Sequence, residues 1–326
     1  VGKRAEVVYA RGYVGDPSGE YNGVKSGQNL EDKRSPEELI AEAVQVAKEC
    51  DYVIFIGGLN KSAHQDCEDS DRKDIALSYG QDAVISALAK ANKNLVVVNI
   101  SGNAVAMPWV KEVPSIVQAW YLGTESGNAI ASILMGDVNP SGKLPFTFPV
   151  ALNDVGAHKL GEYPGVPRND GSKIVDEKYN EGIFVGYRWA EKNKITPLFP
   201  FGHGLSYTTF AYGTPVASSK TITADGNIQV SLTVKNTGAV AGKEIVQLYI
   251  GDEKASVPRP VKELKGFQKV ELLPGEEKEV VFTITDNDLK FFDAAAHAWK
   301  AEPGKFKAYI AASATDVRST VTFEYK

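Results

Sequence analysis

The chain has 326 residues, of which 43% are hydrophobic and 24% charged, and its formal net charge is -5. This composition is typical of a globular protein with two domains. The acidic charge and the lack of a clustered basic segment exclude nucleic acid as a partner. No apolar run reaches the roughly 20 residues of a membrane-spanning helix. Cys50 and Cys67 form no CxxC pattern, so we expect free thiols and no zinc site. The use of cysteine does not determine the cellular compartment of the protein.

Residues 36–137 repeat a unit of helix, apolar strand and polar turn three times. Ser35 as N-cap, Pro36 at the first helical position and Glu38 at the third predict the start of the first helix. The apolar run "DYVIFIGG" that follows is typical of a strand covered on both faces. Further helices and strands alternate over residues 81–92, 94–102, 115–123 and 125–136. This alternation predicts a parallel, doubly wound sheet with right-handed crossovers.

The rest of the chain divides into an irregular segment and an all-β segment. Pro, Gly and aromatic residues are dense over residues 139–208, which we expect to be an ordered connector that wraps the α/β domain. After residue 208, apolar and polar residues alternate in runs separated by turn signals, over residues 227–238, 243–252, 262–272, 278–285, 304–313 and 319–326. The predicted organisation is an α/β parallel-sheet sandwich domain (1–138), the connector (139–208) and an immunoglobulin-like or fibronectin type III-like β-sandwich (209–326).

The segment His64–Arg72, "HQDCEDSDR", places four carboxylates within six residues, directly beyond the first predicted strand. Ligands of open parallel sheets bind beyond the carboxyl ends of the strands, which favours a functional site here. One alternative is a solvated acidic loop. Another is a calcium loop starting at Asp66, but such a loop needs Gly and Glu where this chain has Asp71 and Leu77.

Other common motifs are absent from the sequence. The run "FIGGLNKS" matches neither a dinucleotide-binding fingerprint nor a phosphate-binding loop, and no Gly-x-Ser-x-Gly nucleophile elbow occurs. The four histidines are far apart and lack the spacing of metal ligands. We therefore expect no cofactor and no metal.

Five runs of residues, in this order, resemble the C-terminal half of glycoside hydrolase family 3, which contains β-glucosidases and β-xylosidases. The runs are "GLNKSAHQDCEDSDRKDIALSYGQDAVI", "GNAVAMPW", "AWYLGTESGNAIASILMGDVNPSGKLPFTFP", "YNEGIFVGYRW" and "PLFPFGHGLSYTTF". The resemblance covers nearly the whole chain, because residues 209–326 look like the fibronectin type III-like domain of that family. It implies an exo-acting retaining β-glycosidase, with a β-glucosidase as the first expectation.

The family carries its general acid/base in a Glu-Gly-x-Asp-Arg segment, which residues 68–72 match at Glu, Asp and Arg. Asp69 stands where the family has Gly, and Gly adopts positive φ angles more cheaply than Asp. The resemblance therefore implies Glu68 as the acid/base, with Asp66 and Asp69 as runners-up. The residues expected to bind substrate or support the site are Lys61, His64, Asp71 and Arg72.

The family places its Asp nucleophile on an N-terminal (β/α)8 barrel, and no segment of this chain resembles that barrel. The resemblance thus implies part of a larger enzyme, without the nucleophile and without the first strand and helix of the α/β domain, and inactive alone. The expected partners are the barrel and a β-linked oligosaccharide or glucoside, whose terminal non-reducing β-D-glucosyl residue is removed; a homodimer is a further expectation. The competing interpretations are a non-catalytic module that binds carbohydrate or protein and a small-ligand-binding α/β domain.

Overall fold

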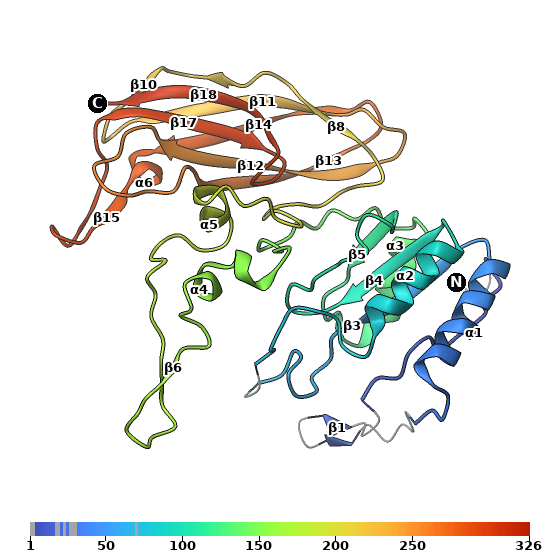
Figure 1. Cartoon of the computed structure of the whole chain (residues 1–326). Helices are drawn as coiled ribbons and strands as arrows, with labels where there is room; N and C mark the ends of the chain where they lie inside the picture. The colour runs from blue at the N-terminus through green and yellow to red at the C-terminus, as the bar shows by residue number, and fades with distance from the viewer. Residues whose placement is uncertain (1–3, 17–19, 22–23, 26–30, 69–70) are drawn as a thin grey trace. The chain divides into compact units, whose positions relative to one another are not determined.

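The computed structural model describes residues 4–16, 20–21, 24–25, 31–68 and 71–326 (Figure 1). The chain separates into two compact units, Val1–Asp137 and Val138–Lys326. Within the described ranges, no helix is long and apolar enough to cross a membrane. The finer boundaries of the three predicted parts stay a prediction.

The first unit is built on a three-stranded parallel sheet with the strand order β3-β4-β5. Its strands and helices follow the predicted alternation, and the α/β fold class is confirmed. The elements are β1 (Glu20–Tyr21), β2 (Val24–Lys25), α1 (Pro36–Glu49), β3 (Val53–Gly58), α2 (Gln81–Ala91), β4 (Leu95–Ile100), β5 (Ser115–Gln118), η1 (Gly123–Glu125) and α3 (Ser126–Leu134).

Among the described residues, helices cover both faces of the central strand β4, but only one face of the edge strand β3. On one face, α2 contacts β3 and β4, and α1 packs against α2. On the other face, Ile130 of α3 packs against Val98 of β4 and Ala119. Ile54 and Ile56 of β3 point to this second face and remain 44% and 52% exposed. The expectation that this strand is covered on both faces is therefore wrong, because α3 packs only over β4 and the β5 side of the sheet.

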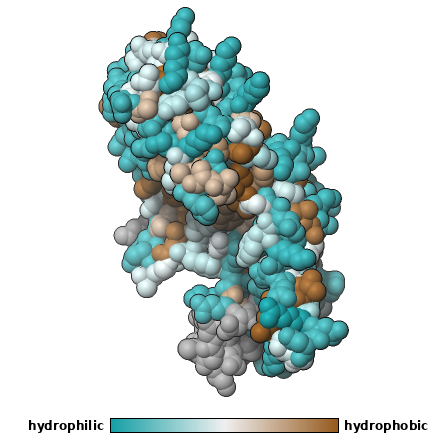
Figure 2. Space-filling model, turned by 90° about the vertical axis from the view of Figure 1, so that its left-hand side faces the viewer, coloured by the Kyte–Doolittle hydropathy of each residue, from teal (hydrophilic) through white to brown (hydrophobic). Residues whose placement is uncertain are grey.

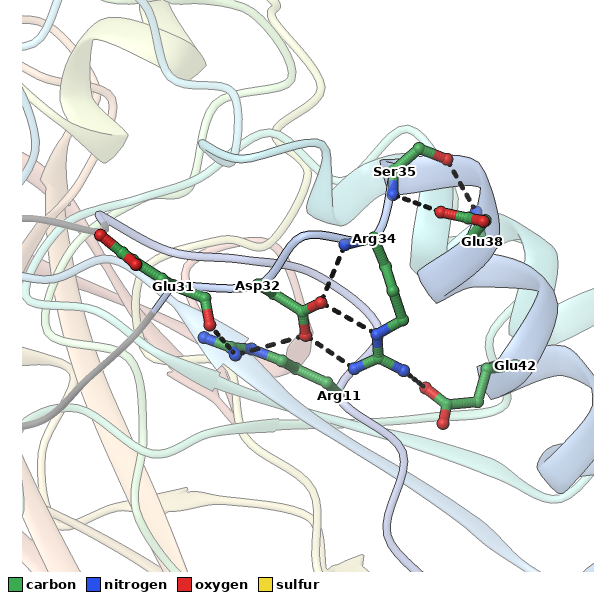
Figure 3. A network of polar contacts seen from close by, with 7 residues as sticks. All are labelled: Arg11, Glu31, Asp32, Arg34, Ser35, Glu38 and Glu42. Atoms are coloured by element: carbon green, nitrogen blue, oxygen red, sulfur yellow. Dashed lines mark hydrogen bonds and ion pairs between the residues drawn. The ribbon is translucent and has the colours of Figure 1, made fainter.

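The start of α1 is fixed by a capping box, as the sequence predicts. The amide of Glu38 donates to Ser35 Oγ at 3.2 Å, and Glu38 Oε2 accepts from the Ser35 amide at 2.7 Å (Figure 3). Such caps satisfy backbone N–H groups that have no partner within the helix. One turn beyond Glu38, Glu42 accepts from Arg34, which also pairs with Asp32 at 2.7 Å (Figure 3).

The second unit contains two packed sheets whose strands pair antiparallel except for the parallel pair β10-β18, consistent with the predicted fibronectin type III-like sandwich. One sheet has the strand order β10-β18-β17-β12-β13 and the other β14-β11-β8, with β9 also paired to β11. The elements are β8 (Phe210–Tyr212), β9 (Val216–Ala217), β10 (Thr221–Ile222), β11 (Asn227–Asn236), β12 (Gly242–Asp252), β13 (Glu263–Leu272), β14 (Glu277–Thr285), α6 (Asp286–Leu289), β15 (Phe291–Asp293), β16 (Ala298–Lys300), β17 (Gly304–Ala311) and β18 (Val317–Tyr325).

The alternation of apolar and polar residues along these strands creates the core between the sheets. In β11, Ile228, Val230, Leu232 and Val234 are buried, and most of the residues between them are exposed. On the face that Figure 2 shows, the outward-facing side chains leave a mostly hydrophilic surface over the sandwich, in the upper part of the picture. The period of two residues therefore reports directly which face of each strand is buried.

Residues 138–208 pack within the second unit by specific contacts with the sandwich. Asn139 Nδ2 donates to the Ala241 carbonyl at 2.9 Å, and Lys143 pairs with the buried carboxylate of Glu244 at 3.0 Å. A single antiparallel bridge joins Phe148 to Phe199. The short elements of this segment are η2 (Leu152–Asp154), α4 (Gly156–Lys159), β6 (Val166–Pro167), β7 (Val175–Asp176) and α5 (Tyr187–Lys192).

Candidate functional site

The acidic segment lies in the loop of residues 59–80, between the carboxyl end of β3 and α2. The strand ends at Gly58, where φ is +132° and an added Cβ would lie 2.0 Å from the Ile100 carbonyl oxygen. The side chain of Gln81 closes the turn, because its Nε2 donates to Gly58 O at 2.8 Å and its Oε1 accepts from Gly58 N at 2.7 Å. A glycine is therefore required at the point where the loop leaves the sheet.

Asp66 joins the loops that follow all three strands of the sheet. Its Oδ2 accepts hydrogen bonds from the Gly102 amide at 2.7 Å and from the Tyr121 hydroxyl at 2.8 Å. Its Oδ1 accepts from Asn103 Nδ2. Gly102 and Asn103 follow β4, and Tyr121 follows β5. Hydrogen bonds to an ionised acceptor are among the stronger ones in proteins, so this carboxylate is held in one place.

Glu68 lies two residues beyond this anchor and has an exposed side chain. Its carboxylate hydrogen-bonds none of the residues that the structure describes. It can therefore meet a ligand or exchange a proton without first breaking an internal contact. Asp69, the residue that departs from the family motif, lies outside the described residues.

Arg72 ties the acidic loop to the loop after β4. Its guanidinium donates to the Ala104 carbonyl at 2.8 Å and to the Ala76 carbonyl at 3.2 Å. Burial lowers the pKa of Arg72 from its usual value, and the carboxylates of Asp66 and Asp74 offset part of this effect. This geometry gives Arg72 a supporting position in the site.

The three other expected site residues lie on the solvent side of the same loop. Lys61, His64 and Asp71 are all exposed. His64 Nδ1 lies 3.0 Å from the Asp71 carbonyl oxygen, so the side chain of His64 contacts the backbone near the other end of the acidic segment. The structure thus gathers Lys61, His64, Asp66, Glu68, Asp71 and Arg72 in one loop at one edge of the sheet.

Three non-glycine residues at this edge have left-handed backbone conformations. The φ angles are +61° at His64, +61° at Tyr79 and +57° at Trp120. Such conformations cost of order 1–3 kcal/mol each and persist where surrounding contacts enforce them, frequently at functional sites. Here the amide side chain of Gln65 donates to the Tyr79 hydroxyl at 2.6 Å, which is one such contact.

Gly102, Asn103 and Tyr121 are site residues that the sequence analysis does not single out. An added Cβ at Gly102 would lie 3.2 Å from the Tyr121 ring and 3.4 Å from Asp66 Oδ2, so this position accepts only a glycine without displacement. A signal for them exists, since "SGN" and "WYLG" directly follow predicted strands whose carboxyl ends share one edge. Their contacts with Asp66, however, depend on the conformations of the loops after β3, β4 and β5.

Cys50 and Cys67, both partly buried, are not joined by a disulfide. Over the described part of the chain, no group of three or more His, Cys, Asp or Glu side chains could hold a metal ion.

A cavity of about 630 Å³ lies beside α1 and α2 in the first unit. Leu39, Ile40 and Val84 supply apolar walls, and Asp32 and Arg34 lie at its border. These two charged groups bind each other (Figure 3), and the hydrogen bonds from Arg34 hold the pKa of Asp32 well below its usual range. Because they already satisfy each other, we assign no ligand to this cavity.

Comparison with known proteins identifies the family. The model of the glycosyl hydrolase family 3 C-terminal domain matches residues 1–207, and the model of the fibronectin type III-like domain matches residues 244–314. The chain belongs to glycosyl hydrolase family 3. The family expected from the five sequence runs is therefore confirmed, together with its α/β and fibronectin type III-like domains.

Several family 3 proteins to which the chain is similar are named as β-glucosidases. The chain is 56% identical over 322 residues to β-glucosidase BoGH3A of Bacteroides ovatus, covering 98% of this chain and 41% of that protein. It is 40% identical over 316 residues to thermostable β-glucosidase B of Acetivibrio thermocellus, covering 97% and 38%. The crystal structure of a Kluyveromyces marxianus β-glucosidase in complex with glucose matches with a TM-score of 0.82 at 38% identity, covering 91% and 34%. The chain thus spans between a third and somewhat over two fifths of these proteins.

Proposed function

We propose that this chain is the C-terminal part of an exo-acting retaining β-glucosidase and that Glu68 is its general acid/base. The observation that carries the proposal is the arrangement of Asp66 and Glu68. One carboxylate anchors the loop at the edge of the sheet where α/β folds bind ligands, and the other, two residues later, is exposed and available. The β-glucosidase names of the relatives support the substrate class.

The contacts favour Glu68 over Asp66 as the proton donor. Both oxygens of Asp66 accept hydrogen bonds, from Gly102, Asn103 and Tyr121, so a proton on this carboxyl group would displace a donor. Glu68 can carry its proton without such a loss. Asp66 is better suited to position the loop, with Arg72 holding the loop's other end to the Ala104 carbonyl.

In a retaining mechanism, two carboxyl groups about 5–5.5 Å apart act on opposite sides of the glycosidic bond. The protonated Glu68 carboxyl group would donate its proton to the leaving-group oxygen while a nucleophilic carboxylate attacks the anomeric carbon. The Glu68 carboxylate would then take a proton from the water that releases the glucosyl group, and this step restores the acid. The nucleophile would come from the barrel portion of the same enzyme.

The test is the Glu68→Gln variant of this chain, joined to or co-expressed with a family 3 barrel. General acid catalysis contributes about 10²–10⁴-fold, so we expect a loss of that size in kcat/KM for alkyl glucosides, whose leaving groups are poor. Activated aryl glucosides need less acid assistance in the first step. Azide, which needs no general base, should therefore rescue their turnover and yield glucosyl azide.

Two matched carboxylate variants sharpen the result. Glu112→Gln, at an exposed carboxylate outside the acidic loop, should keep most of the activity. Asp66→Asn should lower kcat because an amide cannot accept all three hydrogen bonds, but azide should not rescue it. Wild-type turnover in Glu68→Gln would refute the assignment and favour a non-catalytic binding module with a solvated acidic loop.

A further inference from the structure

Three polar side chains meet in the interior of the first unit, at the carboxyl ends of β4 and β5. Asn99 lies one residue before the end of β4, Ser101 directly follows this strand, and Gln118 is the last residue of β5. Asn99 is 2% exposed and Ser101 0%. Burial of apolar surface does not explain polar residues at these positions, so their hydrogen bonds have to.

The hydroxyl group of Ser101 uses its full hydrogen-bonding capacity within this group of residues. Its Oγ accepts from Asn99 Nδ2 at 2.8 Å and from Gln118 Nε2 at 3.1 Å, and it donates to the Asn103 carbonyl at 2.8 Å. Asn99 Nδ2 also donates to Gln118 Oε1 at 2.6 Å. Gln118 Nε2 also donates to the Ser101 carbonyl at 3.0 Å. A hydroxyl group has one donor and two acceptor sites, and all of those of Ser101 are occupied.

A buried network of this kind contributes more to geometry than to stability. Replacing hydrogen-bonded partners by apolar side chains of the same shape can be nearly neutral for folding. A satisfied network, in contrast, rigidifies its surroundings and specifies one arrangement. Here the network holds the backbone carbonyls of Ser101 and Asn103, and it therefore fixes the path of the chain as it leaves β4.

This fixed stretch of chain carries two of the donors that hold Asp66. The Gly102 amide donates to Asp66 Oδ2 at 2.7 Å, and Asn103 Nδ2 donates to Asp66 Oδ1. Asp66 precedes Glu68 by two residues, and consecutive Cα atoms are only about 3.8 Å apart, so a displaced Asp66 also displaces the backbone of Glu68. A continuous series of hydrogen bonds thus links the interior of the sheet to the loop of the acid/base candidate.

We propose that Ser101 is a positioning residue for the reaction, which orients Glu68 through the Gly102 and Asn103 donors and through Asp66. The inference rests on the proposed function and gives Ser101 no contact with the substrate. An acid that is displaced from the glycosidic oxygen donates its proton less efficiently, and a misplacement of about 1 Å can cost about 10²-fold in rate. Loss of the Ser101 hydroxyl should therefore slow the substrates whose leaving groups need the acid.

The test compares Ser101→Ala with the wild type, each joined to a family 3 barrel, on an alkyl glucoside and an activated aryl glucoside. We expect kcat/KM for the alkyl glucoside to fall about tenfold or more, because its leaving group needs a well-placed acid. For the aryl glucoside, whose leaving group needs little protonation, kcat/KM should fall less than about threefold. The ratio of the two values is the readout, since a smaller amount of folded enzyme lowers both values equally.

A double variant tests whether Ser101 acts through Asp66. In the Asp66→Asn background, Ser101→Ala should change the ratio by less than about twofold, because residues of one network have non-additive effects. The full effect of Ser101→Ala in that background would overturn the inference. Ser101→Cys, which keeps the side-chain shape but has a weaker donor, should give a ratio between those of Ser101→Ala and the wild type.

A matched control separates positioning from stability. Asn92 Nδ2 donates to the carbonyls of Ala47 and Cys50 at 2.8 and 2.7 Å, beside the amino end of β4 and away from the acidic loop. Asn92→Ala should lower the temperature of unfolding and leave the ratio unchanged. If it changes the ratio as Ser101→Ala does, the ratio reports instability and the inference is overturned.

Gln118→Met gives a second entry to the network if Ser101→Ala does not fold. It keeps the length of the side chain but removes the donors to Ser101, and it should shift the ratio in the same direction. An unchanged ratio in Ser101→Ala or, in its place, Gln118→Met, with the expected loss in Glu68→Gln, would overturn this inference alone. Wild-type turnover in Glu68→Gln would instead refute the proposed function and this inference with it.

Discussion

Asp66 and Glu68 illustrate how two carboxylates on one short loop take different positions. Asp66 is held by donors from the loops after β4 and β5, whereas Glu68 faces solvent. The sequence motif points to Glu68, since residues 68–72 match the family segment at three positions. The anchor at Asp66 could not be predicted in the same way, because its donors Asn103 and Tyr121 lie 37 and 55 residues away along the chain.

His203 provides a prediction at the residue scale. It is partly buried and stacks on Phe199 with 5.4 Å between ring centroids. Burial lowers the pKa of His203 below its usual value of 6.5; Lys143 lowers it further, and Asp316 offsets part of the shift. The unfolded chain then binds more protons than the folded chain in the window below pH 6.5. The contribution of His203 to stability is thus complete above this window and is lost as the pH falls through 6.5 toward the folded-state pKa.

We therefore expect the unfolding free energy of the second unit to fall between pH 7.5 and pH 5, and to fall less in His203→Phe. Denaturant titrations at several pH values measure this slope. His158, whose pKa is also lowered by burial, should retain its own contribution to the slope in this variant. An unchanged slope in His203→Phe would contradict the prediction.

At the scale of elements, strand periodicity and helix capping predict most of what the structure contains. The capping box at Ser35 starts α1, and the alternation in residues 227–236 forms β11. The prediction failed for one face of β3, where Ile54 and Ile56 remain exposed. A continuous apolar run indicates that both faces are suited to burial, but the covering elements are far away in the sequence. Only the packing of α3 decides which strands it covers.

The end of β3 gives an element-scale prediction. Gly58→Ala would place Cβ 2.0 Å from the Ile100 carbonyl oxygen and force an alanine into a φ of +132°. The Ile100 carbonyl belongs to the backbone and cannot move without disturbing the sheet. The free energy of unfolding should therefore fall by more than about 4 kcal/mol, the range of the most destabilising single substitutions.

Gly80→Ala is the matched control for this variant. Gly80 also has a positive φ, +69°, but no atom lies within 4 Å of its added Cβ. The free energy of unfolding of Gly80→Ala should fall only by the cost of the left-handed conformation, about 1–2 kcal/mol. Thermal unfolding followed by circular dichroism compares the two. Equal losses in both variants would show that steric contact with Ile100 is not the dominant cost.

At the scale of the whole molecule, the chain spans 34–41% of the length of the relatives and solved structure described above. The acid/base candidate, Glu68, lies in the first unit. No motif in the sequence resembles the segment that carries the nucleophile in the family. We therefore expect no turnover of aryl β-glucosides by this chain alone. Co-expression with a family 3 barrel should restore turnover.

The measurement is an aryl glucoside assay on the purified chain, with and without the barrel, on samples of equal circular dichroism. Turnover by the chain alone that Glu68→Gln abolishes would contradict the proposed division of the active site. Sedimentation of the same samples would test the predicted homodimer.

The sequence by itself determined the element types, the fold class, the family and the loop that carries the candidate acid. These properties are local, because capping, hydrophobic period and a five-residue motif each lie within a short stretch of chain. Only the tertiary structure decided which groups meet at Asp66, which face of β3 stays exposed, and that Gln118 of β5 donates to Ser101 after β4. Such contacts join residues far apart in sequence, and they depend on loop closure and packing that no local pattern encodes.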